Sequence, residues 1–289
     1  MLLHPNFQRR VNWRRHFIFA LLCFWSVICL FPIYWVAISS LKDVPTYDGP
    51  AKFLPFIDFT PSLDAWRFIL FEHKDNLVLR FFNSLIVGGA STLITVILAA
   101  MVIYAVTRFH KKPTHGGYKL LSFMMATRIL PPSVIVIPLY FMAVETHMLD
   151  SVLALIAVYA AINLPVALWL LRPIVGDKAT DQEEAAQLDG ASHFYIFFSV
   201  SLPMVKSGLL AVSTIIFLLC WNEYLIATYL TSDHALTLPP WMVGQLSLKE
   251  AQTGGGNEEW IHLSAATIVM MLPTLAFAAY FQKIRRGPN

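Results

Sequence analysis

The chain has 289 residues, of which 57% are hydrophobic and 13% are charged, and its mean hydropathy is +0.60. A soluble domain of average composition contains about 25% charged residues, so roughly half of the expected charge is missing. This composition excludes a soluble globular fold, and the net charge of +3 gives no sign of a nucleic-acid-binding surface.

Apolar residues fall into six blocks, each long enough to span a bilayer, for which about 20 residues suffice. The third block is interrupted by Arg128 and by Pro131-Pro132. Backbone groups freed by proline need partners within the protein or in a wet cavity, so we expect this block to face other helices. The sequence therefore predicts an all-α membrane protein with six transmembrane helices, at about residues 17–39, 82–106, 120–144, 152–171, 208–230 and 261–281.

The first block follows four arginines, as the apolar region of a signal peptide follows basic residues. It is longer than the usual 7–15 or so residues of such a region, and no A-x-A-like cleavage site follows it, so we interpret it as a permanent anchor. Lys and Arg concentrate in both terminal tails and in the loops after the second and fourth blocks. This bias predicts that both termini are cytoplasmic. The expected organisation is a tail (1–16), a transmembrane domain (17–281) with a cytoplasmic loop (172–207), and a second tail (282–289).

The outside segments are predicted at about 40–81, 145–151 and 231–260. The first carries several prolines among aromatic residues, which favours ordered coil over a long helix. These segments either dock an external partner or simply cap the helix bundle.

Nothing in the sequence predicts a catalytic centre or a metal site. Cys23, Cys29 and Cys220 all lie in apolar blocks, where a free thiol behaves as a small hydrophobe. The chain also lacks the G-x-x-x-x-G-K-[ST] pattern that cradles phosphates. We therefore expect no catalytic residue, no metal and no bound cofactor in this chain, and no enzyme activity of its own.

The loop at 172–207 carries the most informative motif. Residues 181–188 are predicted to form a short helix with Asp181 as N-cap and Glu184 three positions later, as in a capping box. Ala185 and Ala186 leave one surface flat, so that another protein can approach closely. Gly190 is expected to end this helix, because only glycine adopts a positive φ cheaply.

A second short helix is predicted to start at Ser192 and to end at Pro203. Its aromatic residues follow i, i+3, i+4 spacing and should form one ridge: Phe194, Phe197 and Phe198. A polar helix-turn-helix at a membrane surface is suited to contact with a soluble protein.

The loop reads Glu184-Ala185-Ala186, then Gly190, then Val200-x-Leu202-Pro203. This spacing matches the pattern E-A-A-x3-G-x9-I-x-L-P, with valine for isoleucine. The pattern is the hallmark of inner-membrane permease subunits of binding-protein-dependent ABC importers, which the chain resembles over nearly its whole length. Further runs resemble the carbohydrate branch, similar to the second permease of maltose-type importers: Asn83-Ser84, Ile137-Pro138-Leu139-Tyr140, Asn163-Leu164-Pro165 and Trp221-Asn222-Glu223.

The resemblance implies a type I importer permease in a bacterial or archaeal inner membrane, whose elbow is a coupling helix seated in a cleft of a cytoplasmic ATPase. The residues it assigns to coupling are Glu184, Ala185, Ala186, Gly190, Phe194, Phe197, Leu202 and Pro203. The implied partners are a second homologous permease, two copies of a P-loop ATPase that hold ATP and Mg, and an extracytoplasmic solute-binding protein. Glu184 is also interpreted as an N-terminal helix charge favoured by the macrodipole, and this role can hold together with coupling.

Polar residues within the blocks are candidates for the substrate path, because they are costly in lipid and usually face the interior. Arg128 is expected either to donate to solute hydroxyls or to pair with a carboxylate such as Glu223. Trp221, Asn222 and Glu223 together suit a sugar or polyol, or else Glu223 and its neighbours join helices. Tyr140 and Asn163 are weaker candidates.

The predicted function is thus the permease subunit of an ATP-driven importer for a sugar, polyol or related solute. Two rival interpretations remain. An ion-coupled transporter would use Arg128 and Glu223 as a relay but leaves the elbow unexplained, and no paired Gly- or Pro-broken segments indicate an inverted repeat. A membrane scaffold without transport leaves the interrupted third block unexplained.

Overall fold

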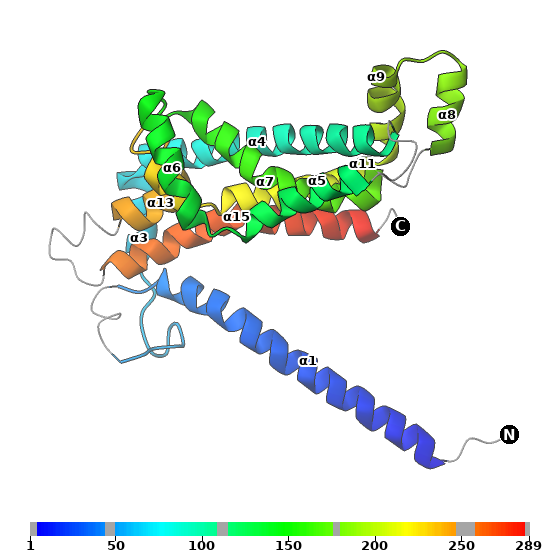
Figure 1. The fold of residues 1–289 in the computed structure, drawn as a ribbon. Coiled ribbons are helices and arrows are strands. Elements are labelled where there is room, and N and C mark those ends of the chain that lie inside the picture. Colours follow the sequence, from blue (N-terminus) through cyan, green and yellow to red (C-terminus); the bar gives the residue numbers. More distant parts are fainter. Residues whose placement is uncertain (1–4, 44–49, 109–114, 176–179, 247–257, 287–289) are drawn as a thin grey trace. The chain divides into compact units, whose positions relative to one another are not determined.

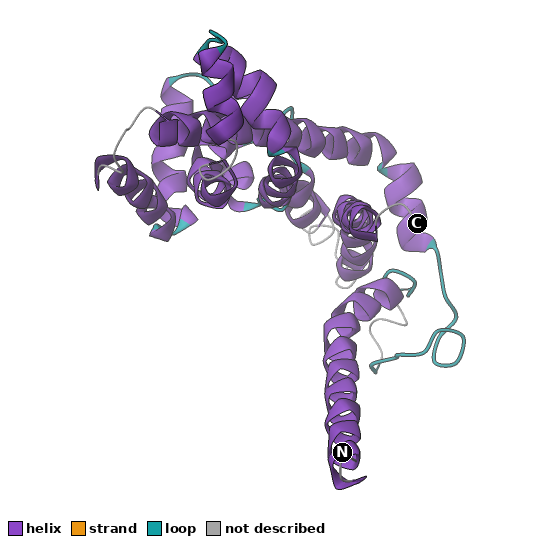
Figure 2. Cartoon of the chain, turned by 90° about the vertical axis from the view of Figure 1, so that its right-hand side faces the viewer, coloured by secondary structure: helices purple, strands orange, loops and turns teal. Residues whose placement is uncertain are grey.

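The computed structural model describes residues 5–43, 50–108, 115–175, 180–246 and 258–286 (Figure 1). Within these ranges the chain is helix and loop, apart from one isolated β-bridge between Pro55 and Phe59 (Figure 2). Two compact units can be distinguished, residues 1–74 with 245–272 and residues 75–244 with 273–289, and each is described by itself.

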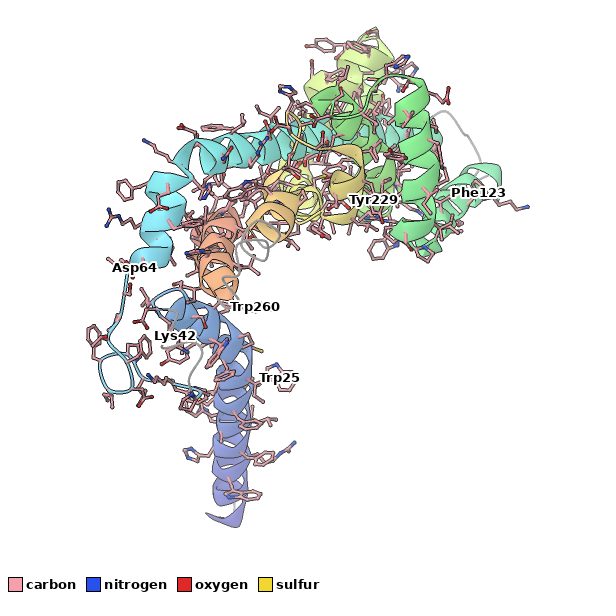
Figure 3. All side chains as sticks on the ribbon, turned by 90° about the vertical axis from the view of Figure 1, so that its left-hand side faces the viewer. Trp25, Lys42, Asp64, Phe123, Tyr229 and Trp260 are labelled. Carbon is pink, nitrogen blue, oxygen red and sulfur yellow. The ribbon has the colours of Figure 1, made fainter. Side chains whose placement is uncertain are left out.

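The first unit contains α1 (Pro5–Ser39), α3 (Asp64–Arg67), the π-helix η1 (Phe68–Glu72) and the first part of α15 (Glu258–Arg286). The described apolar side chains of α1 are exposed along most of the helix, as Trp25 illustrates (Figure 3). The Phe68 ring stacks on His262 with ring centroids 3.8 Å apart. Residues 50–62 are largely coil, as predicted, but the segment from 64 to 72 is helical.

The second unit contains the remaining helices and a common apolar core. In chain order they are α4 (Lys74–Arg108), α5 (His115–Ala126), η2 (Thr127–Ile129), α6 (Pro132–Glu145), α7 (Val152–Val175), α8 (Thr180–Leu188), α9 (His193–Ile196), η3 (Phe197–Ser201), α10 (Leu202–Met204), α11 (Lys206–Trp221), α12 (Leu225–Leu230), α13 (Leu238–Pro240) and η4 (Trp241–Leu246). The end of α15, from Pro273, also belongs here.

Small and hydroxyl side chains let the long helices of this unit approach closely. Ser91 Oγ and Thr95 Oγ1 on α4 donate to the carbonyl oxygens of Ile156 and Ala160 on α7, at 3.2 and 3.3 Å. At Gly208 on α11 a Cβ would lie only 2.5 Å from the Ile174 side chain of α7. Such contacts are typical of helix packing in membranes.

Four helices of the described chain are long and apolar enough to cross a membrane: Trp13–Ser39, Lys74–Arg108, Val152–Val175 and Trp260–Tyr280. They correspond to the first, second, fourth and sixth predicted spans. The helix pair His193–Met204 and Lys206–Trp221, bent by 82°, is a further candidate. We interpret the bend as the junction between the elbow and the fifth span.

The third and fifth predicted spans are each divided between two helices; the interruption of the third was expected, and that of the fifth was not. The third is interrupted at Leu130, whose extended backbone (φ −63°, ψ 128°) separates η2 from α6. Proline disfavours helical backbone in the preceding residue and lacks an N–H, so Pro131-Pro132 accounts for this break. The fifth is interrupted between α11 and α12, at residues 222–224.

A single carboxylate fastens the loop that follows α12. Asp150 accepts backbone N–H groups from all four residues 232–235, at 2.8 to 3.2 Å. Arg80 on α4 forms an ion pair with Asp233 at 2.6 Å, and Asn83 donates to the carbonyl oxygens of His234 and Leu236. Burial alone would raise the pKa of Asp150, but the four N–H groups lower it to about 2.

Replacing Asp150 by Asn is expected to lower the free energy of unfolding by about 1–3 kcal/mol, because it removes charge-assisted hydrogen bonds. Asn tolerates the positive φ of 55° at this position, so the change isolates the charge. Since the folded pKa lies below the ordinary 3.8, the stabilisation is present above about pH 5 and is lost as the pH falls toward 2. Thermal unfolding in detergent across this range measures it.

Glu145→Gln is the matched control, because it neutralises an exposed carboxylate at the end of α6. A D150N variant as stable as this control, or a stability difference that does not shrink in acid, would contradict the assignment.

Candidate functional site

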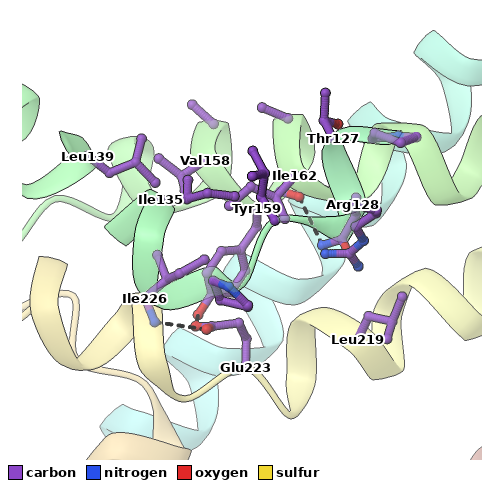
Figure 4. A pocket seen from close by; sticks show the side chains of 16 residues that line it. Thr127, Arg128, Ile135, Leu139, Val158, Tyr159, Ile162, Leu219, Glu223 and Ile226 are labelled. Atoms are coloured by element: carbon purple, nitrogen blue, oxygen red, sulfur yellow. Dashed lines mark hydrogen bonds between the residues drawn. The ribbon is translucent and has the colours of Figure 1, made fainter. Parts of the chain in front are cut away.

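A cavity of about 560 Å³ lies where the two divided spans meet α7 (Figure 4). Its wall combines apolar side chains with a few polar ones, which is typical of small-molecule sites. The residues that line it are Thr127, Arg128, Leu130, Pro132, Ile135, Leu139, Ala157, Val158, Tyr159, Ala161, Ile162, Asn163, Pro165, Leu219, Glu223 and Ile226. Three of the predicted substrate-path residues are therefore brought together: Arg128, Asn163 and Glu223.

Arg128 pairs with an amide and not with a carboxylate, which was one of its two predicted roles. Its Nη2 donates to Asn163 Oδ1 at 3.0 Å, and Asn163 in turn donates to the Tyr159 carbonyl oxygen at 2.9 Å. This is the only hydrogen bond that Arg128 forms within the described residues. The alternative of an Arg128–Glu223 pair is wrong for this structure, and most guanidinium N–H groups of Arg128 remain available beside the cavity.

Glu223 holds the break of the fifth span together. Its carboxylate accepts the Tyr159 hydroxyl at 2.7 Å and the backbone N–H groups of Ile226 and Ala227 at 2.8 and 3.1 Å. These N–H groups belong to the first turn of α12, which has no earlier carbonyl oxygen to accept them. Glu223 thus links α7 to α12, which agrees with its interpretation as a residue that joins helices.

The other three candidates do not line the cavity. Trp221 is 1% exposed and packs against Phe81 and Phe217 at centroid distances of 5.5 and 5.8 Å, so its face is not available to stack on a sugar. Asn222 is exposed and donates to the Leu218 carbonyl oxygen at 2.8 Å. Tyr140 is 38% exposed on α6.

The elbow at 180–204 has the predicted turn. After α8 the N–H of Gly190 donates to the Gln187 carbonyl oxygen and the N–H of Ala191 to that of Ala186, both at 3.0 Å. With φ of +84° at Gly190, this is a Schellman motif, and the prediction of a positive φ is confirmed. Ser192 caps the second helix as predicted, because its side chain accepts the N–H of Tyr195.

The first helix of the elbow exposes only part of the Glu184-Ala185-Ala186 motif to solvent. Glu184 and Ala185 are exposed and Ala186 is half-buried, while Leu188 is 90% exposed. Asp181, predicted as the N-cap, lies inside the first turn. Glu184 and Ala185 therefore lie on the outside of the elbow, whereas Ala186 packs in part against the core.

The predicted aromatic ridge is only partly correct. Phe194 is 69% exposed and Phe198 is 39% exposed, with ring centroids 4.7 Å apart, but Phe197 is only 4% exposed. Phe197 packs on Tyr104 of α4 at 5.2 Å. Residues three apart on a helix differ by about 60° around its axis, and Phe197 lies on the side of the ridge that faces α4. Tyr195, 59% exposed, belongs to the outer surface instead.

The helix continues through Pro203, which lies at the start of α10, and ends at Met204. The π-turn just before it allows this, because proline has no N–H to donate to the preceding turn. Leu202 is half-buried against the core.

The sequence interpretation missed Glu183. This residue is 2% exposed, and its carboxylate receives Arg108 Nε at 2.5 Å and Ser201 Oγ at 2.6 Å. The only sequence feature that could have indicated a role for Glu183 is its position as a second acidic residue directly before Glu184.

Three comparisons place these features among known proteins. The family of binding-protein-dependent transport system inner membrane components matches residues 116–285. The chain is 31% identical to a probable ABC transporter permease protein of Sinorhizobium fredii, over 90% of this chain and 89% of that protein. It is 27% identical to the trehalose/maltose transport system permease of Thermococcus litoralis, over 89% and 88%, and 30% identical to the diacetylchitobiose uptake system permease of Streptomyces coelicolor, over 91% and 83%.

Among solved structures, a bacterial ABC transporter involved in the import of the acidic polysaccharide alginate matches with a TM-score of 0.73. The match covers 98% of this chain and 99% of the other at 17% identity. At this identity the likeness concerns the fold, and it confirms the predicted type I importer permease architecture.

Replacing Tyr159 by Phe removes one of the three donors to Glu223 and is expected to lower the free energy of unfolding by about 1–3 kcal/mol. Tyr140→Phe is the control, because that hydroxyl has no hydrogen-bond partner among the described residues and its loss should change little. Thermal unfolding of both variants in the same detergent measures the difference. Equal stabilities would show that the Tyr159–Glu223 contact does not support the helix break.

Proposed function

Because the chain belongs to the family of binding-protein-dependent transport system inner membrane components, we propose that it carries a sugar, polyol or related solute across the membrane and couples this movement to a separate ATPase. The chain is a multi-pass inner-membrane permease of an ABC importer. Relatives named for trehalose, maltose and diacetylchitobiose support a carbohydrate as the solute.

The observation that carries the coupling role is the two-sided elbow. One side of α8 is anchored to the helix bundle through Glu183, while Glu184 and the turn at Gly190 face outward. A partner that binds this outer surface would therefore grip a part fixed to the transmembrane helices. Within the proposal, Glu184 pairs with a basic residue of the ATPase, and Phe194 and Phe198 fill a groove beside it.

An importer permease works with an ATPase and a solute-binding protein. We further propose a second homologous permease and two ATPase copies, which hold ATP and Mg. This chain would then supply no catalytic group, and its contribution is the path and the coupling surface.

The cavity beside Arg128 is proposed as part of the solute path. Arg128 offers N–H donors to sugar hydroxyl oxygens. Asn163 and Tyr159 line the same wall, but their donor groups already bind the Tyr159 carbonyl oxygen and the Glu223 carboxylate. The apolar wall of α6 and α7 suits the C–H faces of a sugar. Glu223 is occupied by three donors and so holds the site in shape.

Replacing Glu184 by Lys is expected to reduce ATP-dependent uptake of radiolabelled trehalose and maltose by about thirtyfold or more, since losing one partner of a buried interfacial charge pair costs about 2–5 kcal/mol. Gly190→Arg should have a similar effect, because a side chain at φ +84° strains the turn. Uptake into membrane vesicles, with co-purification of the ATPase identified by mass, measures both.

Gln182→Lys is the matched control, because it adds a positive charge to an exposed position of the same helix outside the motif. Membrane insertion should be unchanged in all three variants. Normal uptake in E184K, or a wild-type chain that brings down no ATPase, would overturn the coupling role.

Replacing Arg128 by Gln is expected to lower uptake of the same disaccharides about tenfold at subsaturating concentration, because hydrogen bonds from a charged group contribute about 1.5–3 kcal/mol. The co-purified amount of ATPase should not change, since the hydrogen bond of Arg128 is to Asn163 on α7 and not to the elbow. Asn222→Ala is the comparison, because Asn222 lies outside the cavity wall. Equal effects of the two changes would remove the cavity from the path.

A further inference from the structure

Glu183 is a buried acid on a helix that is otherwise largely exposed. It is 2% exposed, whereas its neighbours Gln182 and Glu184 are both exposed. A carboxylate in such a position is costly unless it is paired and hydrogen-bonded. The contacts that stabilise the buried Glu183 carboxylate are therefore separate from the exposed surface around Glu184.

The contacts of Glu183 join four elements at one point. Arg108, the last residue of α4, donates Nε to Oε2 at 2.5 Å, and Ser201 of η3 donates its hydroxyl to Oε1 at 2.6 Å. Arg108 also donates from Nη2 to the carbonyl oxygen of Val175, the last residue of α7, at 3.4 Å. These four residues form the Glu183 junction, which connects the ends of α4 and α7 to both helices of the elbow.

Apolar packing encloses the junction on the side of the bundle. Ile196 is fully buried, and Phe197 packs on Tyr104 one turn before Arg108. In Figure 1 the elbow helices α8 and α9 lie at the same end of the unit as the end of α4. Water is thus largely excluded from the ion pair, which strengthens it relative to a surface pair.

We propose that the Glu183 junction locks the elbow to α4, so that a displacement of the outer surface by an ATPase moves α4 and α7 with it. Glu183 and Arg108 are positioning residues here, and they act through the elbow without touching the ATPase. The planar guanidinium of Arg108, bound to a buried carboxylate, restrains movement of α8 relative to α4 in either direction. Hydrogen-bond and ion-pair networks of this kind carry coupling between sites. The inference rests on the proposed coupling function.

The test measures whether α8 and α4 move together in the complete complex with its ATPase. Nitroxide labels are placed at Gln182→Cys on α8 and at Leu98→Cys, which is 44% exposed on α4, after the exposed Cys23 and Cys29 are changed to Ser. Pulsed electron resonance gives the distance between the labels without ATP and with ATP bound to a hydrolysis-deficient ATPase. We expect the same distance in both states.

Glu183→Gln is the variant, because Gln keeps the shape and an acceptor for Ser201 but loses the charge. We expect ATP to shift the α8–α4 distance by about 1–2 Å or more, or to broaden its distribution, since helix displacements in switching proteins are of this size. Arg108→Lys keeps the positive charge but loses the planar guanidinium. Its ATP-induced distance shift should lie between those of the wild type and Glu183→Gln. Asp181→Asn removes an exposed carboxylate from the same helix and should behave as the wild type.

The double variant, Glu183→Gln with Arg108→Gln, leaves no unpaired buried charge. The distance is therefore measured in this variant if a single variant fails to assemble. If the two residues act through one contact, its shift equals that of Glu183→Gln alone. An ATP-dependent change of the distance in the wild type, or none in E183Q and the double variant, would overturn the proposal. Absence of any ATPase in the wild-type complex would instead overturn the proposed function on which it rests.

Discussion

Inside a bilayer no water is available to satisfy a free backbone N–H or C=O group, and this constraint organises the centre of the molecule. Two of the six predicted spans are broken, and each break creates such groups. At the break in the fifth span, Glu223 accepts two N–H groups of α12 and the hydroxyl of Tyr159. At the break in the third, proline removes the N–H groups that would need a partner.

Both breaks border the same cavity, and this follows from the same constraint. Irregular backbone at membrane depth is tolerated where protein or a wet cavity surrounds it. The helix interruptions and the polar wall at Arg128 and Asn163 are thus parts of one arrangement. A relay between Arg128 and Glu223, which an ion-coupled transporter would need, is not formed, because each of the two side chains has another partner.

Much of this could be predicted from the sequence, because long apolar blocks and single glycines have few structural solutions. The helical class, the interruption at Pro131-Pro132 and the turn at Gly190 were all predicted, and the structure agrees. The break at residues 222–224 was not, since Trp-Asn-Glu contains no helix breaker. The local sequence does not indicate that the Glu223 carboxylate accepts the N–H groups at the start of α12 in place of backbone carbonyl oxygens.

The residues around the elbow were harder to assign, because their environment depends on long-range packing. Phe197 follows helical spacing but packs inward on Tyr104 of α4, a contact that no local pattern indicated. Glu183 and Glu184 are adjacent and chemically identical, yet only the first faces α4. Arg108, its partner, is 75 positions away in the chain.

The turn at Gly190 has a consequence for how substitutions there are interpreted. Apart from its two chain neighbours, no described residue would lie within 4 Å of a Cβ at this position, so the cost of a side chain here comes from backbone torsion and not from crowding. Within the isolated subunit, residues at 190 should therefore rank by their tolerance of left-handed backbone, with Asn ahead of Ala and β-branched residues last, regardless of volume. If the effect of a substitution at position 190 depends on side-chain size only in the assembled transporter, that dependence would report how closely the docked protein approaches the turn.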